Sequence, residues 1–390
     1  MLTPQTKPFS IRWLKAINEV PQHKWDRLAQ PLATPFLEWQ WLHQLEASGS
    51  ICAGTGWQPN HLTLWQKNEL VAAAPLYIKT HSEGEFVFDY WLAELAGENN
   101  IPYYPKLVGM TPVTPVGGYR FLMDEALDFE RTFDYMLTLI DDFCQNEGLS
   151  GCHLNYVDPK WHKGLPENKF NAWHHQSYIW QNPGYGSFED YLQPFKSNQR
   201  RNIRRERNQM QDKGIEIHAL TGDDIKPEHA AMVYRFYLNT NLQHGPYAAK
   251  YLNAEFFNHI FRHYRQRLLL MTAVQTTDQM PVAMSLLVYK AGHLMGRYWG
   301  CDQQIKDLHF NLCYYAPIEW AIANGIKTFD PGIGSLHKVY RGFESKKSTS
   351  LHRFYEPRLG FIFQHVLTNL NRAEQDHIDQ LNARLPFAQR

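Results

Sequence analysis

Apolar positions in the first half of the chain recur at two spacings, and together they predict a mixed α/β order. Short β-rich runs at residues 61–65 and 70–79 flank the polar turn QKNE, which is typical of a hairpin. Apolar residues three and four apart predict helices at residues 34–48 and 129–144. Further expected elements are strands at residues 10–14, 104–108, 119–123 and 152–157 and a helix at residues 90–95.

The second half repeats this alternation. Helices are predicted at residues 188–213, ended by Gly214, and at residues 308–324, with a last helix beginning near residue 359. Predicted strands are residues 215–220, 268–275, 282–290, 293–300 and 327–330. Residues 171–187 are rich in Gly, Pro and Asn, so we place a boundary there. We therefore expect an N-terminal domain of residues 1–180 and a C-terminal domain of residues 181–390.

Two segments suggest that one fold occurs twice. Residues 71–79 (VAAAPLYIK) and 282–290 (VAMSLLVYK) align without gaps and agree at Val, Ala, Leu and Lys. Each follows a β-run and a polar turn. The helix directly after the strand GRYWG resembles the layout of acetyltransferases, the GNAT fold, in which a helix N-terminus receives the pyrophosphate of acyl-CoA. That fold's Gly-x-Gly phosphate loop is missing after Cys301, which weakens the case for acyl-CoA as donor.

Composition narrows the class of partner. Lys and Arg number 39, as do Asp and Glu, so no overall field attracts nucleic acid or an anionic membrane. Five scattered cysteines predict reduced thiols. The start has no signal-like pattern and no run reaches about 18 apolar residues, so we expect a cytoplasmic protein without a membrane span.

The sequence contains none of the common motifs for a metal site or for a serine hydrolase. Nineteen histidines are present, but no His-Glu-x-x-His or Cys-x-x-Cys spacing occurs. A Gly-x-Ser-x-Gly elbow is also missing. We predict no metal site and no tightly bound cofactor.

The stretch KSNQRRNIRRER is the most basic part of the chain. On a helical projection Arg201, Arg204 and Arg205 gather on the face opposite an apolar stripe. Several guanidinium groups on one face suit bidentate contacts to phosphate, for example of a nucleotide, a lipid-linked sugar or tRNA. The alternative is an ordinary solvated helix face.

The predicted helix at residues 308–324 places a carboxylate on an apolar stripe. Glu319 falls among Leu308, Leu312, Tyr315 and Ile322 on the same projection. A carboxylate in that position must be paired or have a raised pKa. Glu319 is thus either a general base for an attacking amine or one partner of a structural ion pair with an arginine such as Arg297, and Pro317 should kink the helix.

The segment FDPGIGSLHKVYRGF is the strongest functional candidate. It gathers Asp330, His337, Lys338 and Arg341 around glycines that let a backbone approach a ligand closely. An enzyme that forms amides needs a base for the ammonium and donors for the developing oxyanion. This segment can supply both, and the alternative is a glycine-rich connection with an exposed basic edge.

The first half offers a second group of polar candidates. Glu85 and Asp89 lie four residues apart, but the stretch EFVF between them favours a strand over a helix. Tyr104 and Lys106 follow in a proline-rich loop, whose restricted backbone suits a preformed wall of a binding cleft. A purely structural role for the two acids is the alternative.

These motifs together resemble the FemAB-like family of N-acyltransferases, named for peptidoglycan biosynthesis or recognition. The resemblance rests on PFLEWQWLHQLEASGS, PLYIKTHSEGEFVFDYW, YYPKL, NQRRNIRRER, GRYWG, LHFNLCYY and HKVYRGF, and spans roughly residues 10–360. It implies tandem GNAT-like domains and transfer of an acyl or aminoacyl group to an amine. The family pattern falls on Glu85, Asp89, Tyr104, Lys106, Arg201, Arg204, Arg205, Arg297, His309, Tyr314, Tyr315, His337, Lys338 and Arg341. Asn311 and Leu336 depart from it, since each stands where the pattern has an acid.

We therefore expect an N-acyltransferase that acts on an amine of a phosphate-bearing or cell-wall-type acceptor. His337 or Glu319, with Lys338, would carry the chemistry, and the basic helix and Arg341 would hold phosphate. Acyl-CoA and aminoacyl-tRNA are the possible donors, and a small molecule or a cell-wall precursor is the expected acceptor. The alternatives are an acyl-CoA-dependent acetyltransferase and a non-catalytic module that binds peptidoglycan precursor or nucleic acid.

Overall fold

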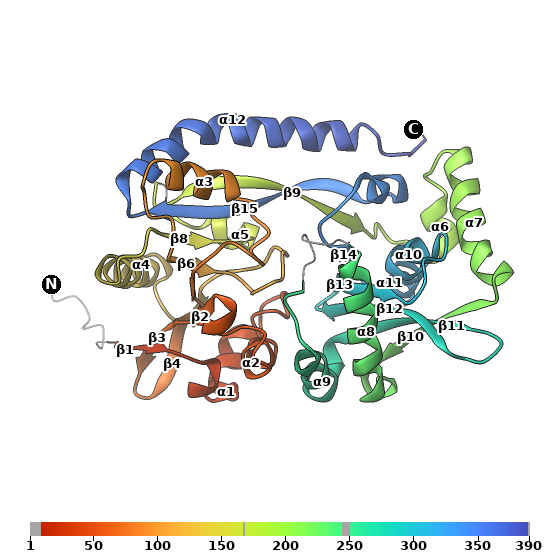
Figure 1. Cartoon of the computed structure of the whole chain (residues 1–390), viewed down its shortest axis with the longest axis horizontal. Coiled ribbons are helices and arrows are strands. Elements are labelled where there is room, and N and C mark those ends of the chain that lie inside the picture. Colours follow the sequence, from red (N-terminus) through yellow and green to blue (C-terminus); the bar gives the residue numbers. More distant parts are fainter. Residues whose placement is uncertain (1–8, 167, 244–249, 389–390) are drawn as a thin grey trace. The chain divides into compact units, whose positions relative to one another are not determined.

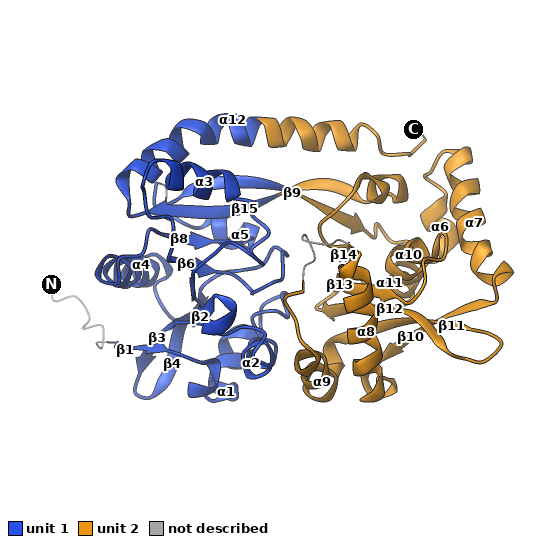
Figure 2. Cartoon of the chain, viewed as in Figure 1, with its two compact units in different colours: residues 1–175, 348–372 blue, residues 176–347, 373–390 orange. Residues whose placement is uncertain are grey.

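The computed structural model describes residues 9–166, 168–243 and 250–388 (Figure 1). Two compact units make up the chain (Figure 2). Unit 1 comprises residues 1–175 and 348–372, and unit 2 comprises residues 176–347 and 373–390. The chain passes from one unit to the other within β9 (Asn171–Gln181), β15 (Glu344–Phe354) and α12 (Pro357–Asn382). Residues 348–372, which we expected in the C-terminal domain, thus belong to the unit formed by the N-terminal residues.

Unit 1 contains a small antiparallel sheet and a mixed group of strands. The small sheet has the order β1-β3-β4-β7, and the mixed group has the order β15-β8-β6-β5-β2. Strands β6 and β8 run parallel and are joined by α4, whereas the other neighbours are antiparallel. The elements are β1 (Ser10–Leu14), α1 (Gln22–Ala29), α2 (Trp39–Ala47), β2 (Trp57–Pro59), β3 (His61–Gln66), β4 (Glu69–Ala74), β5 (Tyr77–Lys79), α3 (Tyr90–Glu98), β6 (Lys106–Gly109), β7 (Leu122–Met123), α4 (Phe129–Asn146), β8 (Gly151–Leu154) and α5 (Pro159–Lys163).

The hairpin predicted in unit 1 is confirmed as β3 and β4. Its turn residues Lys67 and Asn68 both have positive φ, the geometry of the two-residue turns that match the twist of paired strands. The predicted strand at residues 70–79 is two strands, because Pro75 lies between β4 and β5 and proline has no N–H for a strand ladder. The predicted helix at residues 129–144 is α4, whose N-terminus is capped by Asp128.

Unit 2 is built on a six-stranded run with the order β10-β11-β12-β13-β14-β9. Only β13 and β14 are parallel. The elements are α6 (Phe188–Leu192), α7 (Ser197–Asp212), β10 (Ile215–Thr221), α8 (Glu228–Leu242), α9 (Ala254–His263), β11 (Leu268–Gln275), β12 (Pro281–Lys290), β13 (His293–Cys301), α10 (Leu308–Phe310), the π-helical turn η6 (Asn311–Tyr315), α11 (Ala316–Ala323), β14 (Thr328–Asp330) and the 3-10 helix η7 (Leu336–Arg341).

The region of residues 171–187, where we placed a boundary, contains β9, and the chain passes from unit 1 to unit 2 after His175 within this strand. One sequence expectation for the start of unit 2 was wrong. The helix expected at residues 188–213 is two helices, α6 and α7, with Pro194 in the connection between them. The apolar stripe predicted for this region is nonetheless buried, with Phe188, Leu192, Phe195, Ile203 and Met210 in the core of unit 2.

The helix expected at residues 308–324 is interrupted by the π-helical turn η6. Pro317 follows directly, and its nitrogen cannot donate a hydrogen bond to the preceding turn. A π turn adds one residue to the turn and so rotates every later side chain around the helix axis. Glu319 therefore leaves the apolar stripe on which a regular projection placed it, and its side chain is exposed.

The two units repeat one order of elements: helices, an antiparallel hairpin, and a parallel strand pair joined by a helical segment. In unit 1 these are α1 and α2, the hairpin of β3 and β4, and the pair of β6 and β8. In unit 2 they are α8 and α9, the hairpin of β11 and β12, and the pair of β13 and β14. The duplication predicted from residues 71–79 and 282–290 is present in the topology.

Helix α8 lies close against β13 because Gly300 has no side chain. A Cβ atom at Gly300 would lie 2.0 Å from the backbone oxygen of Phe236. Across the described residues, no helix is long and apolar enough to form a membrane span.

Candidate active site

The edge of β13 is only partly paired in unit 2. Strand β13 pairs with β12 along its length, but it pairs with β14 only from His293 to Met295. From Gly296 onward the described residues provide no strand partner on the β14 side. Arg297 and Trp299 lie on this stretch of β13, beyond the part that pairs with β14.

A group of basic side chains adjoins this edge. We call His309, His337, Lys338 and Arg341 the unit 2 cluster. Arg297, whose side chain is 3% exposed, has its Nη2 atom 3.7 Å from Asp330 Oδ1. The loop after Asp330 lies against β13, since a Cβ atom on Gly332 would sit 3.5 Å from the Gly296 oxygen. Segment 329–343, which carries His337, Lys338 and Arg341, therefore passes beside Gly296, where the pairing of β13 with β14 ends.

Lys338 is buried and held by the loop that precedes it. Its Nζ atom donates hydrogen bonds of 2.8 Å to the backbone oxygens of Gly332 and Ile333. Burial lowers the pKa of Lys338 to about 8, although the Asp330 carboxylate opposes this. At neutral pH the Lys338 side chain can therefore exchange a proton, which an ordinary surface lysine does much less readily.

Arg341 is buried and makes contacts on three sides. Its Nη2 atom lies 2.8 Å from Glu206 Oε2, and its Nη1 atom donates to the His337 backbone oxygen at 2.8 Å. The guanidinium carbon lies 3.4 Å from the ring centroid of Phe310. Glu206, from α7, also accepts a hydrogen bond from the Tyr315 hydroxyl. Glu206 was not among the residues expected from the sequence, where it was only the single acid of the basic stretch.

The two histidines of the unit 2 cluster are neutral at physiological pH. Burial, together with the nearby His337, Lys338 and Arg341, lowers the pKa of His309 to about 3. Burial, Arg341 and Lys338 lower the pKa of His337 to about 4. The His309 ring lies 5.6 Å from that of His337 and 4.6 Å from that of Trp299, centroid to centroid. Both imidazoles are thus weak bases that suit hydrogen bonding better than proton capture.

The basic face of α7 is exposed. Arg201, Arg204 and Arg205 point away from the buried stripe, as the projection predicts. Arg204 pairs with Glu189 at 2.5 Å, and both side chains are more than half exposed. This geometry fits a solvated face and leaves Arg201 and Arg205 accessible to a phosphate group.

Glu319 does not join the unit 2 cluster. Its carboxylate is 51% exposed, so its expected place on a buried stripe is wrong. The alternative of an ion pair with an arginine is confirmed, but the partner is Arg207, whose Nη2 atom lies 2.6 Å away, and not Arg297. Asn311, where the family pattern has an acid, donates hydrogen bonds to the backbone oxygens of Glu206 and Asp307. Leu336, the other departure, begins η7 and is partly buried.

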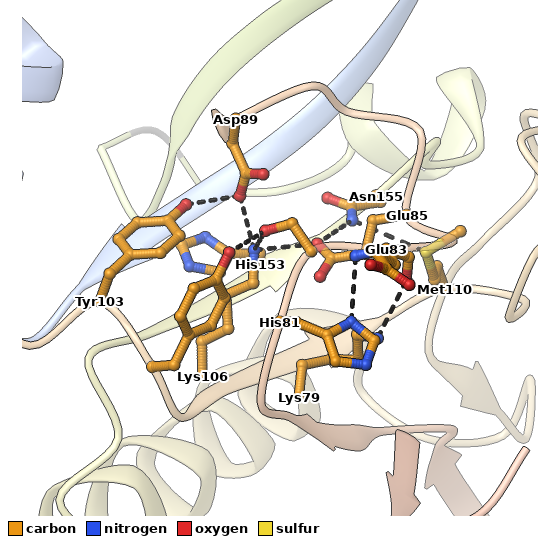
Figure 3. Close-up of polar contacts among 12 residues, drawn as sticks. Lys79, His81, Glu83, Glu85, Asp89, Tyr103, Lys106, Met110, His153 and Asn155 are labelled. Atoms are coloured by element: carbon orange, nitrogen blue, oxygen red, sulfur yellow. Dashed lines mark hydrogen bonds and ion pairs between the residues drawn. The ribbon is translucent and has the colours of Figure 1, made fainter. Parts of the chain in front are cut away.

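A second polar cluster lies in the interior of unit 1 (Figure 3). We call Lys79, Glu85, Asp89, Lys106 and Asn155 the unit 1 cluster. Lys106 Nζ lies 2.5 Å from Asp89 Oδ2 and 3.1 Å from Glu85 Oε2, and none of these three side chains is more than 4% exposed. The ammonium also donates to Ser82 Oγ at 2.9 Å, and the Ser82 hydroxyl lies 2.7 Å from the Tyr104 hydroxyl. Glu85, Asp89, Tyr104 and Lys106 are therefore brought together.

The loop that carries the two acids has an unusual backbone. Glu85, Val87 and Asp89 are buried, whereas Phe88 and Tyr90 are 58% and 53% exposed. Gly84, Phe86 and Phe88 all have positive φ, which is costly for a bulky side chain. The prediction of a strand at EFVF is therefore wrong. The left-handed backbone, and not strand pairing, causes the alternation of buried and exposed side chains.

Burial and charge act against each other in the unit 1 cluster. Burial raises the pKa of Asp89, but the Lys106 ammonium and its hydrogen bonds outweigh this and hold the pKa well below its usual value. Burial raises the pKa of Glu85, and Lys106 only partly offsets it. Burial alone would lower the pKa of Lys106. The negative charges of Glu85 and Asp89 outweigh this effect and raise the pKa, so the ammonium stays charged.

Lys79 is a member of this cluster that sequence reasoning did not single out. Its Nζ atom donates to the Glu83 backbone oxygen at 3.1 Å and lies 3.7 Å from the ring centroid of Trp57. Burial lowers the pKa of Lys79 to about 7, although Glu85 opposes this. The signal was a lysine in a strand whose other residues are apolar, at the position that aligns with Lys290.

Two buried histidines were also missed. His153 in β8 and His352 in β15 place their Nδ1 atoms 2.9 Å apart. Burial lowers the pKa of His153 to about 3 and that of His352 well below its ordinary value. No motif marks this pair, because the two residues are almost two hundred positions apart in the sequence. Within the part of the chain that the structure describes, no group of three His, Cys, Asp or Glu residues is arranged to hold a metal ion.

Known structures resemble this one over nearly the whole chain. FemX is 11% identical, with a TM-score of 0.52, and the match covers 89% of this chain and 98% of FemX. The C-terminal domain of a putative lysylphosphatidylglycerol synthetase from Agrobacterium fabrum is 7% identical, with a TM-score of 0.51, 88% of this chain and 96% of that domain being covered. A tandem GNAT protein from the clavulanic acid biosynthesis pathway is 10% identical at a TM-score of 0.43, covering 89% of this chain and 98% of that protein. No curated protein matches the chain in sequence.

The duplicated topology and the similarity to FemX define the fold as tandem GNAT-like. The family model FemAB-like, described as peptidoglycan biosynthesis or recognition, matches residues 16–389. The chain therefore belongs to the FemAB-like family.

Proposed function

We propose that this protein is an N-acyltransferase that moves an acyl or aminoacyl group onto an amine and forms an amide. Membership of the FemAB-like family and the tandem GNAT-like fold support transfer of this general kind. The observation that carries the proposal is Lys338, a buried lysine with a pKa of about 8 in the loop that returns to the open edge of β13.

Each part of the reaction has a group in unit 2 that suits it. The amine nitrogen attacks the acyl carbon, the N–C bond forms, and the bond from the acyl carbon to the oxygen or sulfur of the donor breaks. Neutral Lys338 takes the proton that the amine loses and can return it to the leaving group. The backbone N–H groups of β13 beyond Met295, where the pairing with β14 ends, are suited to stabilise the oxyanion that forms on the acyl oxygen.

The basic face of α7 and the family description indicate the kinds of donor and acceptor. Acyl-CoA and aminoacyl-tRNA both carry phosphate, which suits the exposed guanidinium groups of Arg201 and Arg205 on α7. The missing Gly-x-Gly loop after Cys301 favours aminoacyl-tRNA. The family description supports a peptidoglycan precursor as the acceptor of the acyl group.

One observation favours a second candidate function, recognition without turnover. His309 and His337 have pKa values of about 3 and about 4 and are poor bases, and Glu319 lies outside the cluster. The family description includes recognition as well as biosynthesis. A binding module would hold a precursor and form no product.

The test is a donor panel with mass-spectrometric detection of the amide. The intact chain is incubated with a lysine-containing peptidoglycan precursor and either acyl-CoA or aminoacyl-tRNA. We expect product with at least one donor, and a loss of about 100-fold or more in kcat for Lys338→Met. Lys347→Met, an exposed lysine of β15, is the matched control and should keep wild-type activity. Full activity of Lys338→Met would remove Lys338 from the reaction, and precursor binding without product for any donor would favour the recognition module.

A further inference from the structure

Three oxygen atoms of the unit 1 cluster are buried without a hydrogen-bond partner among the described residues. They are Glu85 Oε1, Asp89 Oδ1 and Asn155 Oδ1. Each belongs to a side chain that is otherwise engaged, and each residue is at most 3% exposed. Because burying an unpaired acceptor is costly, three in one cluster call for a physical explanation.

The three acceptors belong to one connected group of side chains. Lys106 Nζ joins Asp89 Oδ2 to Glu85 Oε2, and Asn155 Nδ2 lies 3.4 Å from the same Glu85 oxygen. In Figure 3 the side chains of Asp89 and Asn155 face one another above the Lys106 ammonium. The bonded oxygen of each carboxylate faces Lys106, which leaves the other oxygen for a further partner.

Asp89 and Lys106 balance each other while Glu85 is protonated, and a further cation balances the cluster when Glu85 ionises. Asp89 is ionised, and Lys106 is the cation that contacts both acids. Burial lowers the pKa of Lys79 to about 7, and its Nζ atom donates to the Glu83 backbone oxygen and not to either acid. Once Glu85 is ionised, one buried negative charge is therefore compensated only in part.

We infer that the unit 1 cluster binds the ammonium group of a primary amine through Glu85, Asp89 and Asn155. A primary ammonium has three N–H donors and one positive charge, which match three acceptor oxygens and the uncompensated carboxylate. A water molecule has only two donors and no charge, so it would leave one acceptor unpaired. The Lys106 ammonium beside both carboxylates repels a divalent metal ion about twice as strongly as a singly charged ammonium at the same distance.

Exposed residues flank Asp89 along the chain. Asp89 sits between Phe88 and Tyr90, whose side chains are 58% and 53% exposed. Left-handed backbone at Gly84, Phe86 and Phe88 turns Glu85 and Asp89 inward. Such strain is kept where it positions functional groups, and here it holds the two carboxylates.

This inference does not depend on the transfer reaction, because the residues belong to unit 1 and binding is measured without turnover. The test is calorimetric titration of the intact chain with methylammonium chloride at constant ionic strength. Tetramethylammonium chloride and potassium chloride serve as comparison salts, since neither ion has an N–H group. We expect saturable binding of methylammonium and none of the other two ions.

Two substitutions locate the site. Asn155→Leu removes one acceptor and keeps the size of the side chain, and it should weaken methylammonium binding about tenfold or more. Glu85→Gln removes the charge and should weaken binding at least as much. Asn99→Leu, at an exposed amide of unit 1 that donates to Leu95 O, is the matched control and should bind as the wild type does.

Should Asn155→Leu fail to fold, Asn155→Ser removes the amide with a smaller, polar side chain and tests the same acceptor. Equal binding of tetramethylammonium or potassium would overturn the inference, because it would show that N–H donors are not recognised. Wild-type affinity in both Asn155→Ser and Glu85→Gln would overturn it too, as would a wild-type chain that shows no saturable methylammonium binding.

Discussion

The guanidinium of Arg341 stacks on the ring of Phe310, with 3.4 Å between the guanidinium carbon and the ring centroid. The same group pairs with Glu206 of α7, so one buried cation joins η7, α10 and α7. A planar guanidinium can stack and form hydrogen bonds at once, and a lysine ammonium cannot reproduce both contacts.

We therefore expect Arg341→Lys to lower the free energy of unfolding by about 2 kcal/mol or more, because one partner of a buried pair is displaced. Glu319→Gln, at the exposed pair with Arg207, should change it by less than about 1 kcal/mol. Urea denaturation of the two variants beside the wild type measures both values. Equal effects would contradict the structural role of Arg341.

Lys79 should make stability depend on pH in the alkaline range. Its pKa is about 7 in the folded chain and returns to about 10.5 on unfolding, so the unfolded state binds more protons between these values. Within that window the contribution of Lys79 to stability rises as pH rises, and below pH 7 it is constant.

The measurement is denaturation of the wild type and of Lys79→Met at several pH values. The stability of the wild type relative to the variant should increase from about pH 7 to about pH 10.5. Lys347→Met, at an exposed site, should show no such trend. A wild-type minus Lys79→Met difference that stays constant across this range would refute the buried state of Lys79.

The pair formed by His153 and His352 predicts sensitivity to acid. The folded-state pKa of His153 is about 3 against about 6.5 when unfolded, so protons favour the unfolded chain as pH falls through 6.5. The lowered pKa of His352 acts in the same direction. Each buried histidine then removes up to about 1.4 kcal/mol of stability per pH unit in this range.

Replacing both histidines by glutamine should flatten this dependence. The free energy of unfolding is compared at pH 7, 6 and 5, so that the slope is measured even if the variant is less stable at every pH. His23, an exposed histidine of α1, provides the control substitution His23→Gln, which should keep the wild-type slope. A wild-type slope in the double variant would show that other groups cause the acid sensitivity.

A chain that ends at residue 180 should not form a stable unit 1. It lacks residues 351–354 of β15, which pair with β8, and Arg353, whose Nε and Nη2 atoms each lie 2.8 Å from a carboxylate oxygen of Asp141. Circular dichroism and size-exclusion chromatography should show an unfolded or aggregated product.

The matched comparison joins residues 348–372 to residues 1–175 through a flexible linker. This chain contains every segment of unit 1 and should be more soluble and more cooperative in its unfolding than the truncated chain. Equal behaviour of the two chains would show that β15 and the first part of α12 add little to unit 1.

Elements with a local cause were predictable from the sequence. The hairpin of β3 and β4 followed from two β-rich runs around a polar turn, and α4 followed from its apolar spacing. The loop at residues 84–89 was not predictable in this way. Its residues alternate between buried and less buried positions as in a strand, but the cause is the left-handed backbone at Phe86 and Phe88. Glu319 was misplaced because a π turn shifts the register of a helix without a clear sequence mark.

The candidate sites show the same limit. His337, Lys338 and Arg341 were singled out because segment 329–343 is a short, dense motif, and His309 was singled out through the family resemblance. Long-range packing brings Glu206 to Arg341 and His153 to His352. The spacing of these residues along the chain therefore does not predict the contacts. The nearly neutral pKa of Lys79 likewise depends on burial, which only the folded chain supplies.

Because residues 348–372 complete unit 1, a nascent chain on the ribosome cannot finish its first unit when that unit's N-terminal part emerges. The edge of β8 that pairs with β15 stays open while residues 176–347 are being synthesised. Unpaired strand edges invite association with other chains. Biosynthesis of this protein thus includes a long interval in which a chaperone can shield that edge, and slower translation lengthens the exposure.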